Sequence, residues 1–185
     1  MLIVQIRGTS GAGKTTAMRK IIAELAKTTP RPLEIRAEGK KRPVSYGYGS
    51  IAVVGAYTEA TCGGCDTISG YKLLFDVVNQ RIKEGYKSIL MEGLLLSEDV
   101  KNTLTLPVES LRIIFLTTPI ETCLDRVGQR RKAKGNEEPL NPTNTRNRVE
   151  TILRARRRLE DAGVKCISAS GDQAPGIVLR WLKGG

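Results

Sequence analysis

The chain has 185 residues, of which 40% are apolar and 26% charged, and its formal net charge is +11. This length favours one domain over residues 1–185, and the composition excludes wholesale disorder. No apolar run reaches the roughly 18 residues that cross a bilayer. The apolar start at residues 1–6 has the pattern of a buried strand and not of a signal peptide. We therefore expect a cytoplasmic protein that does not contact a membrane.

Predicted strands and helices alternate along the chain. Apolar runs predict strands at residues 2–7, 33–37, 88–91, 111–116 and 164–168. Amphipathic segments predict helices at residues 14–27, 71–84, 94–102, 119–134, 143–162 and 175–182. A hairpin insertion around residues 44–57 is the one departure from this alternation. The order predicts an α/β fold with a mainly parallel sheet and helices on both faces.

A glycine-rich segment follows the first predicted strand and opens the first predicted helix. It matches the phosphate-binding pattern G-x-x-x-x-G-K-[ST] in full, with the residues Gly8-Thr9-Ser10-Gly11-Ala12-Gly13-Lys14-Thr15. Its backbone amides and the helix N-terminus are suited to hold phosphate oxygens. We expect Lys14 to reach the β- and γ-phosphates of ATP and the Thr15 hydroxyl to coordinate Mg²⁺, while Thr16 continues the helix at the edge of the ATP site. The alternative is a glycine turn followed by a chance Lys-Thr pair.

Two carboxylates are candidates for the chemistry. Glu92 ends the apolar strand at residues 88–91, where it is expected to hold Mg²⁺ or to orient the acceptor; the alternative is a surface glutamate. Asp66 lies in the glycine- and cysteine-rich loop 59–68. The chain has no histidine, so a general base must be Asp, Glu, Lys or water. Asp66 is the candidate base, and an equally good alternative is that it caps the following helix near Ser69.

The same loop contains a C-x-x-C pattern formed by Cys62 and Cys65. Such a pattern is found in redox and zinc sites, but a four-ligand zinc site lacks its usual partners here, because there is no second pair and no histidine. We favour a tight glycine loop with reduced thiols.

Positive charge is concentrated between residues 126 and 158, a stretch that contains eleven lysines and arginines but only three glutamates. Arg126 and Arg130 are four residues apart and share one face of a predicted helix. This placement predicts a lid over residues 126–145 that supplies cations to a transferring phosphoryl group. The alternative is a solvated basic face. The arginines further along, from Arg146 to Arg158, are candidates for contact with a nucleic-acid backbone.

Three segments together carry a resemblance to a known family: residues 5–15, 62–68 and 91–97. They resemble bacteriophage P-loop kinases of nucleotide-kinase-like fold that phosphorylate 5-hydroxymethyluracil in DNA. The resemblance implies ATP, Mg²⁺ and hydroxymethylated DNA as partners, a base role for Asp66, and the host cytoplasm as the location. It also gives the positive charge a reason, and a base within a duplex would have to flip outward to be reached.

Two other functions fit the same residues. One is a small-molecule kinase that acts on a nucleoside monophosphate or a sugar nucleotide, since its phosphate loop and lid would look alike. The other is an ATPase or a nucleotide-gated binding protein without an organic acceptor, which Asp66 and its loop disfavour.

Overall fold

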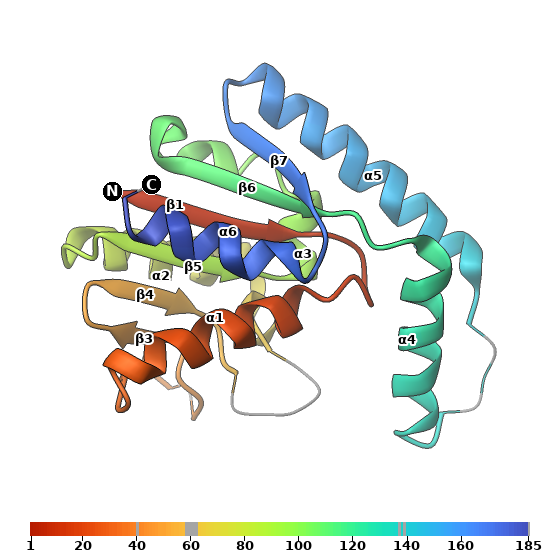
Figure 1. Cartoon of the computed structure of the whole chain (residues 1–185), viewed down its shortest axis with the longest axis horizontal. Coiled ribbons are helices and arrows are strands. Elements are labelled where there is room, and N and C mark those ends of the chain that lie inside the picture. Colours follow the sequence, from red (N-terminus) through yellow and green to blue (C-terminus); the bar gives the residue numbers. More distant parts are fainter. Residues whose placement is uncertain (40, 58–62, 137, 139, 185) are drawn as a thin grey trace.

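The computed structural model describes residues 1–39, 41–57, 63–136, 138 and 140–184. Within these residues one sheet of seven strands has the order β2-β3-β4-β5-β1-β6-β7 (Figure 1). The strands are β1 (Leu2–Arg7), β2 (Leu33–Ile35), β3 (Ser45–Tyr48), β4 (Ile51–Val54), β5 (Ser88–Glu92), β6 (Leu111–Leu116) and β7 (Lys165–Ala169). Strands β4, β5, β1, β6 and β7 run parallel, whereas β2 and β3 are antiparallel to their neighbours at one edge.

The central strands are apolar because both of their faces are covered. Every residue of β5 is buried, and β1 is buried from Ile3 onwards. Continuous apolar runs of this kind are typical of parallel strands between two helical layers. The two layers follow from the packing: residues of β1 alternate between one core shared with α2 and α5 and another shared with α1 and α6.

Helices therefore cover both faces of the sheet, as predicted. They are α1 (Lys14–Thr28), α2 (Gly70–Lys83), α3 (Leu94–Glu98), α4 (Ile120–Lys132), α5 (Pro142–Asp161) and α6 (Gln173–Leu182). Helix α4 is different, because it projects from the end of the sheet instead of lying on a face (Figure 1). Cys123 is its one fully buried residue, so little of α4 is fixed by the core.

The α/β prediction and the hairpin of β3 and β4 are confirmed, and three local predictions are wrong. The helix predicted to reach residue 102 ends at Glu98, because the Asp99 carboxylate accepts the amides of Asn102 and Thr103 and starts a new turn. The hairpin is predicted to reach residue 57, but its second strand, β4, ends at Val54. Gly55 turns there with φ +98°, and a Cβ on it would lie 2.2 Å from the Gly64 carbonyl carbon.

The third wrong prediction concerns the edge of the sheet. The segment predicted as a strand at residues 33–37 forms only β2, and it pairs antiparallel with β3. The hairpin is thus part of a three-stranded antiparallel edge, and it is not the only departure from simple alternation.

A buried arginine ties the end of β1 to the turn after α3. Arg7 has no exposed surface, and its guanidinium donates to the Asp99 carbonyl at 2.6 Å, to Thr103 Oγ1 at 2.7 Å and to Gln5 Oε1. It also lies 6.0 Å from the Phe115 ring centroid. Burial lowers the Arg7 pKa to about 10, so the group remains charged at neutral pH. This network fixes the backbone immediately before the glycine-rich segment.

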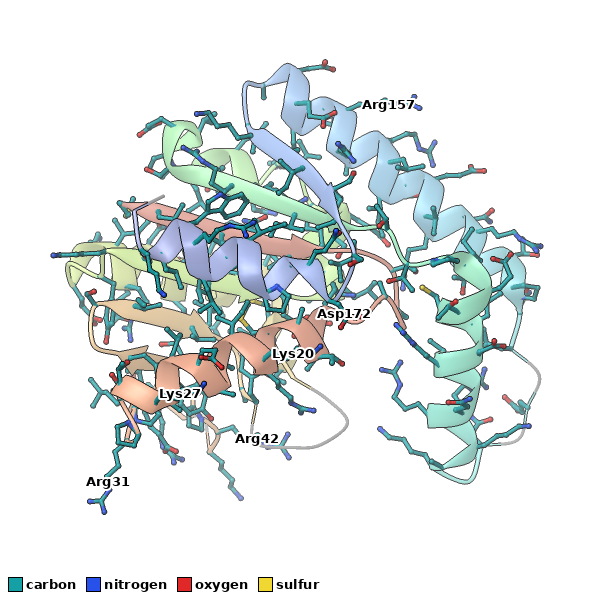
Figure 2. The ribbon with its side chains drawn as sticks, in the orientation of Figure 1. Lys20, Lys27, Arg31, Arg42, Arg157 and Asp172 are labelled. Atoms are coloured by element: carbon teal, nitrogen blue, oxygen red, sulfur yellow. The ribbon has the colours of Figure 1, made fainter. Side chains whose placement is uncertain are left out.

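We expect Arg7→Ala to lower the free energy of unfolding by roughly 3–5 kcal/mol, because it leaves a cavity and removes donors from buried acceptors. Arg157→Ala is the matched control, since Arg157 is exposed on α5 (Figure 2) and its loss should change stability by less than about 0.5 kcal/mol. Urea unfolding of both variants measures the difference. Equal effects would show that the Arg7 network does not stabilise this edge.

Candidate active site

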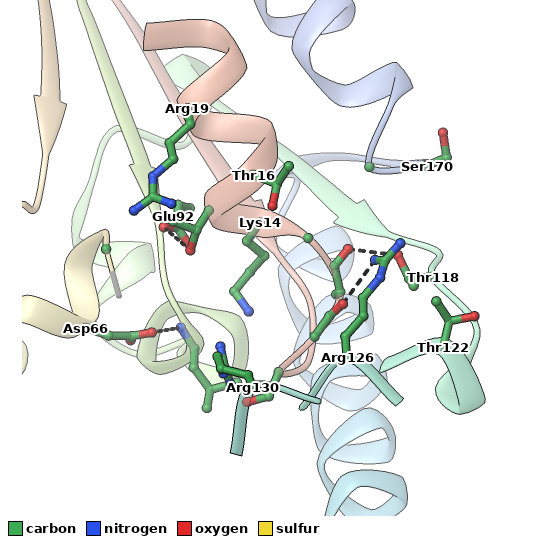
Figure 3. A pocket seen from close by; sticks show the side chains of 18 of the residues that line it. Lys14, Thr16, Arg19, Asp66, Glu92, Thr118, Thr122, Arg126, Arg130 and Ser170 are labelled. Carbon is green, nitrogen blue, oxygen red and sulfur yellow. Dashed lines mark hydrogen bonds between the residues drawn. The ribbon is translucent and has the colours of Figure 1, made fainter. Parts of the chain in front are cut away.

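A cleft of about 1030 Å³ opens at the carboxyl ends of the parallel strands. Its walls come from the glycine-rich segment, the end of β5, the loops after β6 and β7, and helix α4 (Figure 3). Ligands of open α/β sheets bind at this edge. The structure brings the predicted residues 10–16, Asp66, Glu92, Arg126 and Arg130 together in this one cleft.

Residues 8–15, here called the phosphate loop, are held in a tight curl by glycines. Gly11 and Gly13 have φ values of +81° and +96°, which residues with a side chain rarely adopt. A Cβ on Gly11 would lie 2.4 Å from the Cys123 carbonyl oxygen of α4. Helix α4 and the loop before it also brace the phosphate loop, because Thr118 Oγ1 donates to Ala12 O at 2.8 Å and Arg126 donates to Gly11 O at 3.2 Å.

Lys14 lies inside the phosphate loop and is only 7% exposed. Its ammonium donates to the carbonyl oxygens of Gly8 at 2.8 Å and Thr9 at 3.0 Å. Burial lowers the pKa of this ammonium, and the carboxylates of Glu92 and Asp66 partly oppose the shift. The cation is thus held by its own loop, beside the curl of amides that is suited to phosphate oxygens.

Thr15 and Glu92 form an oxygen pair next to Lys14. The Thr15 hydroxyl donates to Glu92 Oε1 at 2.9 Å, and Glu92 is 1% exposed at the end of β5. Burial raises the Glu92 pKa to about 7, and the nearby Lys14 and the Thr15 hydrogen bond moderate that shift. Glu92 is therefore not the surface glutamate of the alternative reading. Two adjacent oxygen donors of this kind fit Mg²⁺, which prefers oxygen ligands.

Asp66 faces the cleft and also caps a helix. Its carboxylate oxygens accept the amides of Leu94 at 2.8 Å and Leu95 at 3.1 Å, the first two residues of α3. The sequence-based alternative placed this cap on the helix that follows Asp66. That assignment is wrong, because α2 has Ser69 at its N-cap position without a side-chain cap bond. The base role of Asp66 stays a prediction.

Cations line two walls of the cleft. Arg126, Arg130, Arg131 and Lys134 come from α4 and the residues just after it, and Arg19 comes from α1. Arg19 lies beside Glu92 (Figure 3) and was missed by the sequence analysis. The sequence could have indicated Arg19, because it follows Thr15 by four residues and therefore lies on the helix face that meets the cleft.

The loops after β6 and β7 contribute polar residues that no motif indicated. Thr117 and Thr118 follow β6, and Ser170 and Asp172 follow β7; all four line the cleft. Asp172 also pairs with Lys20 at 2.7 Å, which joins α1 to the start of α6 (Figure 2). Only the parallel sheet order could have found them, since it brings the carboxyl ends of neighbouring strands to one edge.

Two predicted arginines of α5 have partners within the chain. Arg148 pairs with Glu98 at 2.6 Å. Arg156 pairs with Glu160 at 2.8 Å and lies 5.4 Å from the Phe115 ring centroid. These two arginines therefore help to dock α5 on the body of the molecule.

Some predictions fall on residues outside the described part of the chain. Residues 58–62 are among them, including Cys62 and the first four residues of the glycine- and cysteine-rich loop 59–68, as are residues 137 and 139 of the expected lid. Cys65 is buried, and burial raises its thiol pKa well above the ordinary value. Among the described residues, no cluster of three His, Cys, Asp or Glu side chains is placed to hold a metal ion. No helix in this part of the chain is long and apolar enough to cross a membrane.

A phosphate-binding loop between the first strand and first helix of a parallel sheet, with the Thr15–Glu92 oxygen pair and cationic α4 around one cleft, defines a P-loop kinase. Comparison with known proteins narrows this class. The family model described as 5-hmdU DNA kinase matches residues 2–162, and the chain belongs to this family.

Named relatives agree with that assignment. The chain is 35% identical to a 5-hmdU DNA kinase of Pseudomonas phage PaMx11, covering 98% of this chain and 97% of the relative. It is 29% identical to a 5-hmdU DNA kinase of Pseudomonas phage M6, covering 84% of each. Among solved structures, shikimate kinase from Acinetobacter baumannii in complex with shikimate is 18% identical with a TM-score of 0.45, covering 100% of this chain and 94% of that one.

The Glu92 pKa predicts a pH-dependent stability. Burial favours the neutral acid, so this stabilising contribution is complete below the ordinary pKa of 4.5 and is lost as the pH rises through about 7. The loss amounts to at most about 3 kcal/mol. Glu92→Gln removes this component, so the variant should gain stability relative to the unchanged protein between pH 5 and pH 8. Urea unfolding at both pH values measures it, with the exposed Glu121→Gln as control; a pH-independent difference would contradict the burial argument.

Proposed function

We propose that this chain transfers the γ-phosphoryl group of ATP to the hydroxymethyl group of 5-hydroxymethyluracil in DNA. The carrying observation is that Lys14, the Thr15–Glu92 pair and Asp66 meet in one cleft, in a chain that belongs to the 5-hmdU DNA kinase family. The acceptor is taken from the description of the family, and the cleft contains the groups that a phosphoryl transfer needs.

Each residue of the cleft has a separate role in binding the phosphates or Mg²⁺. The amides of the phosphate loop hold the phosphate oxygens, and Lys14 leaves its own carbonyls to bind the β- and γ-phosphates. Thr15 and Glu92 hold Mg²⁺, which when bound neutralises charge on the phosphates. Glu92 must then be ionised, and the neighbouring Lys14 and a bound cation both favour that form.

The acceptor oxygen attacks the γ-phosphorus, the bond to the leaving ADP oxygen breaks, and the hydroxyl proton passes to a base. Asp66 is the base in this proposal. Its two oxygens each accept one amide, and a carboxylate has about four lone-pair sites in all, so capacity for the proton remains. It also lines the cleft together with Glu92 and Lys14.

In this proposal the lid predicted over residues 126–145 begins in the second half of helix α4. Arg126 and Arg130 face the cleft and stabilise the charge of the transferring group. A helix with one buried residue is held by few core contacts and can change its position as substrates bind.

The charge of the cleft suits a polyanionic acceptor. Among the described residues, six cationic side chains line the cleft against three carboxylates, namely Lys14, Arg19, Arg126, Arg130, Arg131 and Lys134 against Asp66, Glu92 and Asp172. The affinity of proteins for DNA comes largely from such cations against backbone phosphates. A nucleobase must leave its stack to reach a reactive phosphate inside a cleft, at a cost of a few kcal/mol.

The test of this function is transfer of label from γ-labelled ATP. The protein is incubated with Mg²⁺ and, in parallel, with 5-hydroxymethyluracil DNA, unmodified DNA and a panel of free nucleotides. We expect label on the hydroxymethylated DNA alone. Label on a free nucleotide would establish a small-molecule kinase instead, and free phosphate alone would establish an ATPase.

Lys14→Ala should abolish this transfer, because it removes the cation that stabilises charge at the phosphates. Lys27→Ala is the matched control, since Lys27 lies at the exposed far end of α1 and pairs with Glu24 (Figure 2). It should transfer label at the unchanged rate. Near-normal turnover by Lys14→Ala would refute the assignment of the phosphate loop.

Two substitutions separate the base role of Asp66 from its cap role. Asp66→Asn keeps an acceptor for the α3 amides but cannot take up a proton, whereas Asp66→Ala loses both properties. If Asp66 is the base, both variants should slow transfer by ~10²-fold or more and still bind ATP. A normal rate for Asp66→Asn with a slow rate for Asp66→Ala would leave only the cap.

A further inference from the structure

A buried serine behind the phosphate loop lies within hydrogen-bond distance of two carbonyl oxygens, although its hydroxyl has only one proton to donate. Ser97 of α3 has no exposed surface, and its hydroxyl oxygen accepts the Gly8 amide at 3.0 Å. The same oxygen lies 3.0 Å from the Gly8 carbonyl oxygen and 2.8 Å from the Gly93 carbonyl oxygen. A hydroxyl has a single proton, so Ser97 can donate to only one of these two carbonyls at a time.

The contact of Lys14 with Gly8 indicates which of the two carbonyls needs that proton. The Gly8 carbonyl already accepts the Lys14 ammonium at 2.8 Å, so it is satisfied without Ser97. The shorter contact of Ser97 is to Gly93. Ser97 therefore donates to Gly93 while Lys14 serves Gly8.

With ATP bound, the Gly8 carbonyl becomes the one that needs a donor. In the proposed function, Lys14 turns towards the phosphates and leaves the carbonyls of Gly8 and Thr9. The Thr9 carbonyl keeps the Ala12 amide at 3.2 Å. Among the contacts of the described residues, the Gly8 carbonyl keeps only Ser97. A buried carbonyl left without a donor is costly, so the hydroxyl of Ser97 has reason to turn.

Rotation of the Ser97 hydroxyl does not leave the Gly93 carbonyl without a hydrogen-bond donor. Gly93 is the N-cap residue of α3, and an N-cap carbonyl accepts the first hydrogen bond of its helix. The Gly93 carbonyl thus keeps a partner after losing the hydroxyl, whereas the Gly8 carbonyl would not.

We propose that Ser97 is a positioning residue for ATP binding: its hydroxyl proton moves from the Gly93 carbonyl to the Gly8 carbonyl as Lys14 leaves for the phosphates. The oxygen of Ser97 accepts the Gly8 amide throughout, so the start of the phosphate loop stays in place. This inference rests on the proposed role of Lys14 in holding ATP. Asp66 fixes the other end of the same short helix through Leu94 and Leu95.

The first test is a double-mutant cycle without nucleotide. Lys14→Met removes the ammonium and fills its space with an apolar chain, so the Gly8 carbonyl then depends on Ser97 alone. We expect Ser97→Ala to lower the urea midpoint more in the Lys14→Met background than in the unchanged protein. Additive effects overturn the inference. If the double variant is too unstable for a urea midpoint, the ATP-affinity test below decides the inference.

The second test measures ATP affinity and turnover separately. Ser97→Ala should weaken ATP binding about tenfold, which is the cost of one unsatisfied buried carbonyl. The rate at saturating ATP should stay within a few-fold, because that cost is already present in the bound state. Ser45→Ala is the control, as Ser45 is an equally buried serine in β3 that contacts Arg81. Unchanged ATP affinity in Ser97→Ala overturns the inference.

The two tests distinguish this inference from the proposed function. If the unchanged protein binds no ATP, the proposed function fails, and the cycle in urea still decides whether Ser97 and Lys14 share the Gly8 carbonyl. If ATP binds but hydroxymethylated DNA is not labelled, only the acceptor is wrong.

Discussion

The site depends on one buried cation that is held by backbone carbonyls of its own loop. Lys14 can remain charged at 7% exposure because the Gly8 and Thr9 carbonyls and the nearby Glu92 offset the loss of water. The same arrangement makes the cation available to a ligand, since phosphate oxygens offer more negative charge than carbonyls do. In the proposed function, stability without nucleotide and affinity for nucleotide therefore both depend on the Lys14 ammonium.

The rest of the molecule holds that loop from several sides. Arg7 fixes the strand before it, Ser97 binds its first residue, and α4 contacts its tip at Gly11. These braces come from segments far apart in the sequence. Ordering a loop of glycines costs much conformational entropy, and the surrounding contacts offset this cost for the one curl that faces the cleft.

Much of this site follows from the sequence, where local patterns determine it. The phosphate loop and Glu92 are set by a motif and by the end of an apolar strand, and both lie where those patterns predict. The cap made by Asp66 could not be predicted, because its partner Leu94 is 28 residues away and no spacing links a loop acid to a helix of five residues. The end of β4 was missed because the tight approach of Gly55 to Gly64 is a tertiary contact.

The contact between Gly11 and Cys123 also divides α4 into two parts with different freedom. The root of the helix lies against the backbone of the loop, where even one added carbon would collide. Beyond this root the helix runs out towards residues 133–141 without another fully buried side chain among those described. Insertions and deletions in that outer stretch can therefore change the shape of the cleft mouth without disturbing the approach of Gly11 to Cys123.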